Sequence, residues 1–451
     1  MNITSINPYN QEEVATIKAL NLDEIEEKLT RAQSTFKSWR KTPYKERSTH
    51  LINVAKELKK NKQEYAETMT REMGKPISQA IAEVEKCAWV CEYYAENSER
   101  HLGIKNIETE ASKSYVRYDP IGVVLAVMPW NYPFWQVFRF IAPALMAGNI
   151  GLLKHASNVM QSAENIQKVF ERAGLPKGCF QNMAIGSDRI ENIVRDPRIK
   201  AITLTGSKPA GAAVASTAAS EIKKSVLELG GSNALVVFDD CDFDATVQTC
   251  VQARYQNTGQ SCIAGKRLLI EDKVYDKFLS AFAKAVTQLK SGDPMDPDTY
   301  IGVMAREDLA KELEEQLQKS ISEGAKVLLG GHRHGAYFEP TIVTDVTPEM
   351  TIFKEETFGP VISITTFKTD EEAVDLVNQS DFGLGVSIFT KDEARVEKLI
   401  PLFEDGAVFV NDMVKSNPNL PFGGTKISGY GRELSSDGIQ EFVNKKTVYI
   451  K

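Results

Sequence analysis

Cys262 has surroundings that differ from those of an ordinary structural cysteine. It lies in YQNTGQSCIAGKR (255–267), among small and amide side chains, with Gly259 three positions before it and Gly265 three positions after it. A free cysteine is only a few per cent thiolate at pH 7, so a nucleophilic role requires a helix N-terminus, a cation or a nearby base. We therefore consider Cys262 either a nucleophile whose flanking glycines leave its sulfur accessible, or a half-buried structural thiol.

The histidines do not suggest a Cys–His hydrolase. Only His155, at the end of a predicted strand, belongs to a stretch with candidate chemistry; the others are His50, His101, His332 and His334.

A carboxylate is a better candidate base. Glu228 is a lone acid in the apolar run VLELGGSNALVVF (226–238). Apolar surroundings raise the pKa of a carboxyl group toward neutrality, where a general base is useful. The alternative is an acid at a strand end that points into solvent.

Two prolines enclose a candidate oxyanion-binding amide. In MPWNYPFWQVFRF (128–140), Trp130 and Asn131 stand between them, and a rigid turn could fix the Asn131 amide where negative charge develops. An aromatic core loop is the alternative. Arg139 is a lone charge among apolar neighbours in the same run, so we expect it either to reach solvent or to meet a buried anion.

A strand-to-helix turn could bind phosphate. LTGSKPAG (204–211) places Gly206 at the end of a predicted strand and Gly211 inside a predicted helix, where free backbone amides can hold an anion. The spacing is not GxGxxG, so an ordinary turn remains open. The stretch FKEETFGPV (353–361) indicates only a loop.

These stretches fall within an alternation of strands and helices. Apolar runs predict buried strands that alternate with helices, which is typical of a parallel, doubly wound α/β sheet. The first series covers 121–129, 150–155, 181–185 and 201–206, and the second covers KRLLIE, KVLLGG, PVISITTF, GVSIFT and AVFVN. Residues 1–100 look helical. The terminal KKTVYIK predicts a strand that pairs either with another subunit or within its own chain.

Size and composition fit an ordinary globular protein of two domains. At 451 residues two domains are expected, and a net charge of −7 without a basic run makes nucleic acid an unexpected partner. No apolar segment is long enough for a membrane span, and the polar first residues do not resemble a signal peptide. Six cysteines in so long a chain, without CxxC pairs, predict free thiols and no metal site, so we expect a reducing cytoplasmic environment.

Taken in order, the motifs resemble those of the NAD(P)-dependent aldehyde dehydrogenase superfamily. They are MPWNYPF, GLLKHAS, LTGS, LELGG, NTGQSC, EETFGPV and LPFGGTKISGYGRE, and the likeness runs from about residue 5 to the end. RYQNTGQ ahead of the cysteine is most similar to bacterial succinate-semialdehyde dehydrogenases. The resemblance implies an α/β aldehyde dehydrogenase fold. Its parts would be a Rossmann-like cofactor-binding domain (1–100 and 121–230), an α/β catalytic domain (231–430) and a small β oligomerisation arm (101–120 and 431–451).

The resemblance also implies a covalent mechanism. Cys262 would attack the aldehyde carbon, the Asn131 side chain and the Cys262 N–H would hold the oxyanion, and hydride would pass to the nicotinamide. Glu228 would then deprotonate the water that hydrolyses the thioester. In this light the glycines around Cys262 leave room for the aldehyde and the nicotinamide. The family commonly forms oligomers, so a homodimer or homotetramer is expected, with the tail strand paired across a dimer.

Cofactor contacts follow from the same resemblance. They are Trp130, Lys154, Ser157, Gly206, Ser207, Gly211, Leu229, Glu356 and Phe358. NAD-preferring relatives often carry an acid at the place of Ser157, which would repel the 2′-phosphate of NADP. Ser157 removes that repulsion and Lys154 adds a cation, so NADP or NAD is expected, with NADP favoured.

The substrate is implied less directly. Arg139 matches an arginine that relatives use on the carboxylate of succinate semialdehyde, while Gln256 stands where those relatives have a second arginine. Ser416, before LPFGG, could add a polar contact. A small-molecule aldehyde is the expected partner, either succinate semialdehyde or a neutral medium-chain or aromatic aldehyde. The aromatic residues Phe134, Trp135 and Phe138 would suit the neutral alternative.

Two other functions are less compatible with these residues. A CoA-acylating relative would not need Glu228 to activate water. A catalytically silent binding or structural protein on the same fold would be expected to lack Cys262 or Glu228, and both are present.

Overall fold

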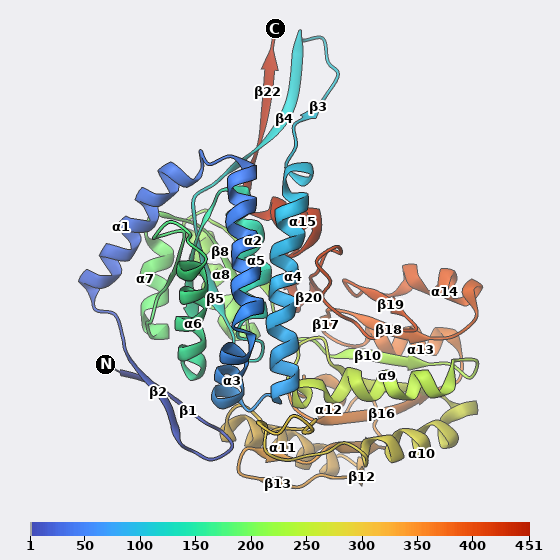
Figure 1. The fold of residues 1–451 in the computed structure, drawn as a ribbon. Coiled ribbons are helices and arrows are strands. Elements are labelled where there is room, and N and C mark those ends of the chain that lie inside the picture. The colour runs from blue at the N-terminus through green and yellow to red at the C-terminus, as the bar shows by residue number, and fades with distance from the viewer. Residues whose placement is uncertain (1) are drawn as a thin grey trace.

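The computed structural model describes residues 2–451 and contains two α/β units and a projecting arm (Figure 1). The first unit has a six-stranded sheet in the order β21-β9-β8-β5-β6-β7, in which all strands except β21 are parallel. Its strands are β5 (Val123–Met128), β6 (Ile150–His155), β7 (Phe180–Asn182), β8 (Ile199–Thr205), β9 (Lys224–Glu228) and β21 (Gly429–Tyr430). The parallel doubly wound sheet predicted for this part of the chain is confirmed.

Helices surround this first sheet. Those that follow its strands are α5 (Trp135–Ala147), α6 (Met160–Arg172), α7 (Ile190–Arg195), α8 (Lys208–Ser220) and α15 (Ser435–Glu441). The helices α1 (Leu22–Trp39), α2 (Tyr44–Lys60), α3 (Lys62–Met73) and α4 (Ile77–His101) come from the N-terminal part of the chain. Their apolar faces pack into one core with β5, β6 and β8, because each helix has an apolar stripe that must be buried.

The expectation of a wholly helical N-terminal region is wrong for the first residues. Strands β1 (Asn2–Ile6) and β2 (Glu13–Lys18) form an antiparallel pair ahead of α1. In β1 the buried side chains alternate with exposed ones, Ile3 and Ser5 facing inward. This period of two is the signal of a half-buried strand.

The second unit has a seven-stranded sheet in the order β12-β15-β16-β11-β10-β18-β19. Its strands are β10 (Asn233–Val237), β11 (Gly265–Glu271), β12 (Lys326–Leu329), β15 (Thr341–Thr344), β16 (Val361–Phe367), β18 (Val386–Phe389) and β19 (Val408–Val410). All neighbours are parallel except β12 and β15, so the KVLLGG segment is an antiparallel edge strand. Ala234 and Val236 pack into one core while Leu235 and Val237 pack into another, so both faces of the sheet are buried.

Helices and short elements complete this unit. The helices are α9 (Phe243–Tyr255), α10 (Tyr275–Val286), α11 (Glu307–Ser322), α12 (Thr351–Lys354), α13 (Asp370–Asn378) and α14 (Glu393–Leu399). The short strands are β13 (Arg333–His334), β14 (Tyr337–Phe338), β17 (Phe382–Gly383) and β20 (Thr425–Lys426). In residues 2–451 the 3₁₀ turns are η1 (Ser157–Val159), η2 (Ser187–Arg189), η3 (Gln256–Gly259), η4 (Asp272–Val274) and η5 (Ile400–Leu402).

The arm is a three-stranded sheet that projects from the body of the molecule (Figure 1). It consists of β3 (Lys105–Asn106), β4 (Lys113–Pro120) and β22 (Val443–Ile450), with β22 antiparallel to β4 along its whole length. The terminal strand therefore pairs within its own chain and remains an edge of this sheet. The predicted domain boundaries stay predictions. In residues 2–451 no helix has the length and apolar character needed to cross a membrane.

Candidate active site

Cys262 lies in a tight loop between α9 and β11. The backbone before it is left-handed at three successive residues, Asn257, Thr258 and Gly259, with φ of 56°, 54° and 71°. For residues other than glycine such conformations cost about 1–3 kcal/mol each and occur where a structure fixes them for a function. The loop thus holds Cys262 in a defined position, half-buried and on the wall of a cavity.

The flanking glycines also have a packing reason. A Cβ at Gly259 would lie 2.4 Å from the carbonyl oxygen of Gly359, and a Cβ at Gly265 would lie 2.5 Å from the Leu235 side chain. Both glycines are therefore required by close packing behind the loop. The expectation that they also leave room for ligands at the sulfur stays a prediction.

The loop presents donors for an oxyanion. The backbone N–H of Cys262 has no hydrogen-bond partner within residues 2–451. Asn131 is 4% exposed, and its Nδ2 donates to the carbonyl oxygen of Gln260, 3.2 Å away. Since an amide nitrogen has two hydrogens, the second remains for a ligand. The Asn257 side chain fixes this turn by donating to the Asn131 carbonyl at 3.0 Å.

Burial controls the acidity of the thiol. It raises the pKa of Cys262 to about 11, and nearby Arg139 and Lys266 oppose this rise. The thiol is therefore largely protonated at neutral pH and needs a base to become a nucleophile.

Sequence reasoning missed Lys266, which is 1% exposed and donates to the carbonyl oxygens of Ser261 and Cys262 at 2.7 and 2.8 Å. Its only sequence signal was a lysine inside an apolar strand.

Glu228 is the candidate base. It ends β9, is 1% exposed, and neither carboxylate oxygen has a hydrogen-bond partner among the described residues. Burial raises its pKa well above the ordinary value, with Arg139 acting in the opposite direction. The alternative of an acid that points into solvent is wrong. An unpartnered carboxylate in a buried site is suited to accept a proton near neutral pH.

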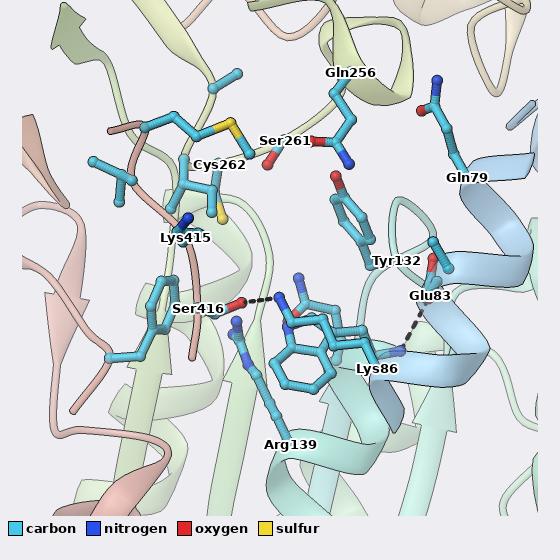
Figure 2. Close-up of a pocket in the computed structure, with 18 of the residues that line it drawn as sticks. Gln79, Glu83, Lys86, Tyr132, Arg139, Gln256, Ser261, Cys262, Lys415 and Ser416 are labelled. Carbon is cyan, nitrogen blue, oxygen red and sulfur yellow. Dashed lines mark hydrogen bonds between the residues drawn. The ribbon is translucent and has the colours of Figure 1, made fainter. Parts of the chain in front are cut away.

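A cavity of about 230 Å³ opens beside Cys262 (Figure 2). Its walls come from α4, from the start of α5, from the cysteine loop and from the loop at 413–422. The three predicted substrate residues, Arg139, Gln256 and Ser416, all line it. Of the aromatic residues expected there, Trp135 lines the cavity, whereas Phe134 and Phe138 are completely buried in the core.

Arg139 forms an ion pair with a buried carboxylate. Its Nε forms an ion pair with Glu433, its guanidinium donates to Thr205 at 3.2 Å, and its charge lies 4.8 Å from the centre of the Phe422 ring. Arg139 and Glu433 are 1% and 5% exposed. The expectation that Arg139 reaches solvent or meets a buried anion is thereby resolved in favour of the anion.

Predicted cofactor residues gather at the carboxyl ends of β5, β6 and β8. Trp130 follows β5, Lys154 and Ser157 lie at the end of β6, and Gly206 and Ser207 join β8 to α8. Ligands of open α/β sheets bind at this edge, where loops and helix N-termini converge. Ser207 is the N-cap residue of α8, but its hydroxyl accepts no hydrogen bond from the first backbone N–H groups of the helix. These N–H groups are therefore not occupied by the Ser207 side chain.

The other cofactor candidates are arranged around this edge. A Cβ at Gly211 would lie 2.7 Å from Leu229, so glycine lets α8 approach β9 closely. Trp130 and Phe358 make an edge-to-face contact with ring centres 5.6 Å apart. Glu356 accepts from the backbone N–H of Gly231 at 3.0 Å and pairs with Lys266 at 3.0 Å.

Comparison with known proteins agrees with this arrangement. The model of the aldehyde dehydrogenase family matches residues 1–448. The chain belongs to the aldehyde dehydrogenase family. It is 49% identical, over the full length of both chains, to a probable succinate-semialdehyde dehydrogenase [NADP(+)] of Synechocystis sp..

Other family members are similar over the same length. A succinate-semialdehyde dehydrogenase [NADP(+)] 1 of Mycobacterium tuberculosis is 46% identical, again with complete coverage of both chains. Among solved structures, succinic semialdehyde dehydrogenase of Streptococcus pyogenes in complex with NADP+ superposes with a TM-score of 0.97 at 36% identity, covering 99% of each chain. The aldehyde dehydrogenase fold inferred from the sequence motifs is therefore confirmed.

Proposed function

We propose that this aldehyde dehydrogenase oxidises succinate semialdehyde to succinate, with NADP as the favoured hydride acceptor and NAD as the alternative. The observation that carries the proposal is the cavity at Cys262, whose walls hold Arg139, Lys86 and the hydroxyl of Ser416. An aldehyde with a distal carboxylate matches such a lining. The names of the full-length relatives in Synechocystis and Mycobacterium support the same substrate and cofactor.

The residues of the site suggest how the reaction proceeds. The Cys262 thiol passes its proton to a water molecule as sulfur bonds to the aldehyde carbon, and the oxyanion of the thiohemiacetal accepts from the Cys262 N–H and the Asn131 amide. Bound NADP supplies the acceptor for the hydride that leaves this carbon. Glu228 then takes a proton from the water that attacks the thioester and returns it to the departing sulfur, which releases the acid and restores the thiol.

The residues present fit NADP. Burial lowers the pKa of Lys154, and no carboxylate lies within 4.0 Å of its ammonium in the part of the chain that the structure describes. Lys154 is half-buried and Ser157 is exposed beside it. A phosphate monoester on the cofactor ribose would give this cation a partner, and Ser157 would add a hydroxyl donor.

Cofactor preference is tested with Ser157→Glu. The new carboxylate repels a 2′-phosphate and accepts from a 2′-hydroxyl, so the ratio of kcat/KM for NADP to that for NAD should fall about tenfold or more, which corresponds to about 1.4 kcal/mol. Ser157→Ala serves as the control for loss of the hydroxyl alone. An unchanged ratio in Ser157→Glu would remove Ser157 from the cofactor site.

A neutral aldehyde is the alternative substrate. The observation that favours it is the ion pair of Arg139 with Glu433, which compensates the arginine charge inside the protein. Trp135, Tyr132 and Phe422 add apolar surface to the same cavity. The decisive measurement is kcat/KM of the purified protein for succinate semialdehyde, hexanal and benzaldehyde with each cofactor. Preference for the semialdehyde supports the proposal, and preference for hexanal or benzaldehyde contradicts it.

We further propose that the protein acts in the cytoplasm as a homodimer or homotetramer. The open edge of β22 on the projecting arm supports self-association, because exposed strand edges pair readily with other strands. Light scattering of the full chain and of a chain ending at residue 442 tests this. A monomeric full-length protein would contradict the proposal.

A further inference from the structure

Lys86 is a cation on the wall of the cavity that the motifs did not identify. It lies on α4, where Gln79, Ala82, Glu83 and Lys86 share the face that lines the cavity. Its Nζ donates to the Ser416 hydroxyl at 2.8 Å and lies 4.2 Å from the centre of the Trp135 ring. Figure 2 shows Lys86 and Ser416 pointing toward each other beside Arg139, with Gln256 and Gln79 across the view.

Three lining cations differ in how their charges are compensated. Arg139 forms its ion pair with the buried Glu433, and Lys415 pairs with Asp412 at 2.5 Å. Lys86 has no carboxylate within 4.0 Å in residues 2–451. It is therefore the lining cation whose charge the protein leaves without a counter-ion.

The nearest acid on the same helix face is already engaged. Glu83 forms a buried ion pair with Lys75 and accepts from the backbone N–H groups of Phe134 and Trp135, both at 2.9 Å. These contacts hold the start of α5 against α4. Glu83 thus stabilises the packing of α5 against α4. Lys86 faces the cavity, and its one hydrogen-bond partner among the described residues is the Ser416 hydroxyl.

We propose that Lys86 binds the distal carboxylate of the substrate, together with the hydroxyl of Ser416. A half-buried ammonium without a counter-ion gains a charge-assisted hydrogen bond when a carboxylate enters the cavity. Three donors on one nitrogen allow Lys86 to keep its bond to Ser416 while it contacts the ligand. The inference rests on the proposed function and names the side chain that selects an ω-oxo acid over a neutral aldehyde.

The acidity of Lys86 supports this role. Burial, together with the positive charges of Arg139 and Lys415, lowers its pKa to about 8. The anionic form of Cys87 and the carboxylate of Glu83, both on α4, act in the opposite direction. A bound carboxylate favours the charged ammonium, so ligand binding raises the pKa of Lys86.

The test compares Lys86→Met and Lys86→Arg with the unchanged enzyme, using succinate semialdehyde and butanal, a neutral aldehyde of the same chain length. We expect Lys86→Met to lower kcat/KM for the semialdehyde about 10- to 100-fold, mostly through KM, because a hydrogen bond to a charged group contributes about 1.5–3 kcal/mol. Butanal turnover should stay within about twofold, and Lys86→Arg should retain most of the preference.

Lys415→Met is the matched control. It removes a lysine of the same cavity whose charge Asp412 already compensates, so its effect on the semialdehyde should be clearly smaller than that of Lys86→Met. Equal effects of the two variants would indicate a general field of positive charge and would overturn the specific role of Lys86. Equal losses for semialdehyde and butanal in Lys86→Met would show a structural role and would overturn it too.

The pH dependence gives an independent readout. In the unchanged enzyme KM for succinate semialdehyde should rise above about pH 8, as Lys86 loses its proton, and the rise should be absent in Lys86→Arg and with butanal. If the unchanged enzyme prefers the semialdehyde and Lys86→Met does too, the proposed function stands and the inference fails. If the unchanged enzyme has no such preference, the proposed substrate itself is wrong.

Discussion

The Nε of Arg139 forms a buried ion pair with the carboxylate of Glu433. This contact joins α5 to the segment ahead of α15, and Arg139 also lines the cavity beside Cys262. A substitution of Arg139 therefore changes two things at once, the charge near the substrate and the partner of a buried acid. Substrate recognition by Arg139 can be measured only when these effects are separated.

Removal of either partner should destabilise the fold. Arg139→Met leaves Glu433 buried without a counter-ion, and breaking such a pair typically costs about 3–5 kcal/mol. We expect a corresponding fall in the free energy of unfolding, followed by circular dichroism in urea. The double variant Arg139→Met with Glu433→Gln should recover most of the loss. A single variant as stable as the unchanged protein would show that the pair contributes nothing to stability.

Loss of the Asn131 amide should impair catalysis without unfolding the protein. One oxyanion donor contributes about 100- to 1000-fold to turnover, so Asn131→Ala should lose that much in kcat. Steady-state production of NADPH measures the loss, and an unchanged melting temperature is the control. Near-normal turnover would exclude Asn131 from the oxyanion site.

Glu228→Gln should slow hydrolysis of the thioester without slowing its formation. The neutral amide of this variant would not deprotonate water, so the thioester should accumulate after one rapid release of reduced cofactor per active site. Stopped-flow fluorescence measures this burst and the slow phase after it. Because burial raises the pKa of Glu228, thioester hydrolysis in the unchanged enzyme should slow as the pH falls through that pKa. A variant with undiminished steady-state turnover would contradict the base role.

Glu72 should make stability depend on pH. It is fully buried and accepts from the backbone N–H groups of Gln161 and Ser162 at the start of α6, next to Ser157. Burial raises its pKa from 4.5 to about 7, so the folded state binds the proton more tightly than the unfolded state. Its contribution is fully present below pH 4.5 and is lost as the pH rises toward 7, by roughly 3 kcal/mol at about 1.4 kcal/mol per pH unit.

Urea titrations of the unchanged protein and of Glu72→Gln at several pH values measure this effect. The variant lacks the titrating group, so between pH 4.5 and 7 the unfolding free energy of the unchanged protein should fall by roughly 3 kcal/mol relative to that of the variant. A difference that stays constant over this interval would exclude Glu72 as the source of the dependence.

The sequence by itself determined the fold class and the main chemical candidates. Apolar runs of strand length separated by amphipathic helices require a parallel sheet with both faces covered, and β5, β6 and β8 fall where those runs predicted them. Cys262, Glu228 and Asn131 were candidates because of their neighbours in sequence, and the resemblance to aldehyde dehydrogenase motifs assigned their roles. Local patterns of this kind do not depend on distant parts of the chain.

Tertiary structure decided the partners of buried charges. Lys86 and Ser416 are 330 positions apart and meet only because α4 and the 413–422 loop line one cavity. Glu433 forms an ion pair with Arg139 because a buried charge needs a partner of opposite charge. Folding can bring that partner from any position in the sequence. The glycines beside Cys262 likewise could not be explained from neighbours in sequence, since the atoms they accommodate, at Gly359 and Leu235, belong to other elements.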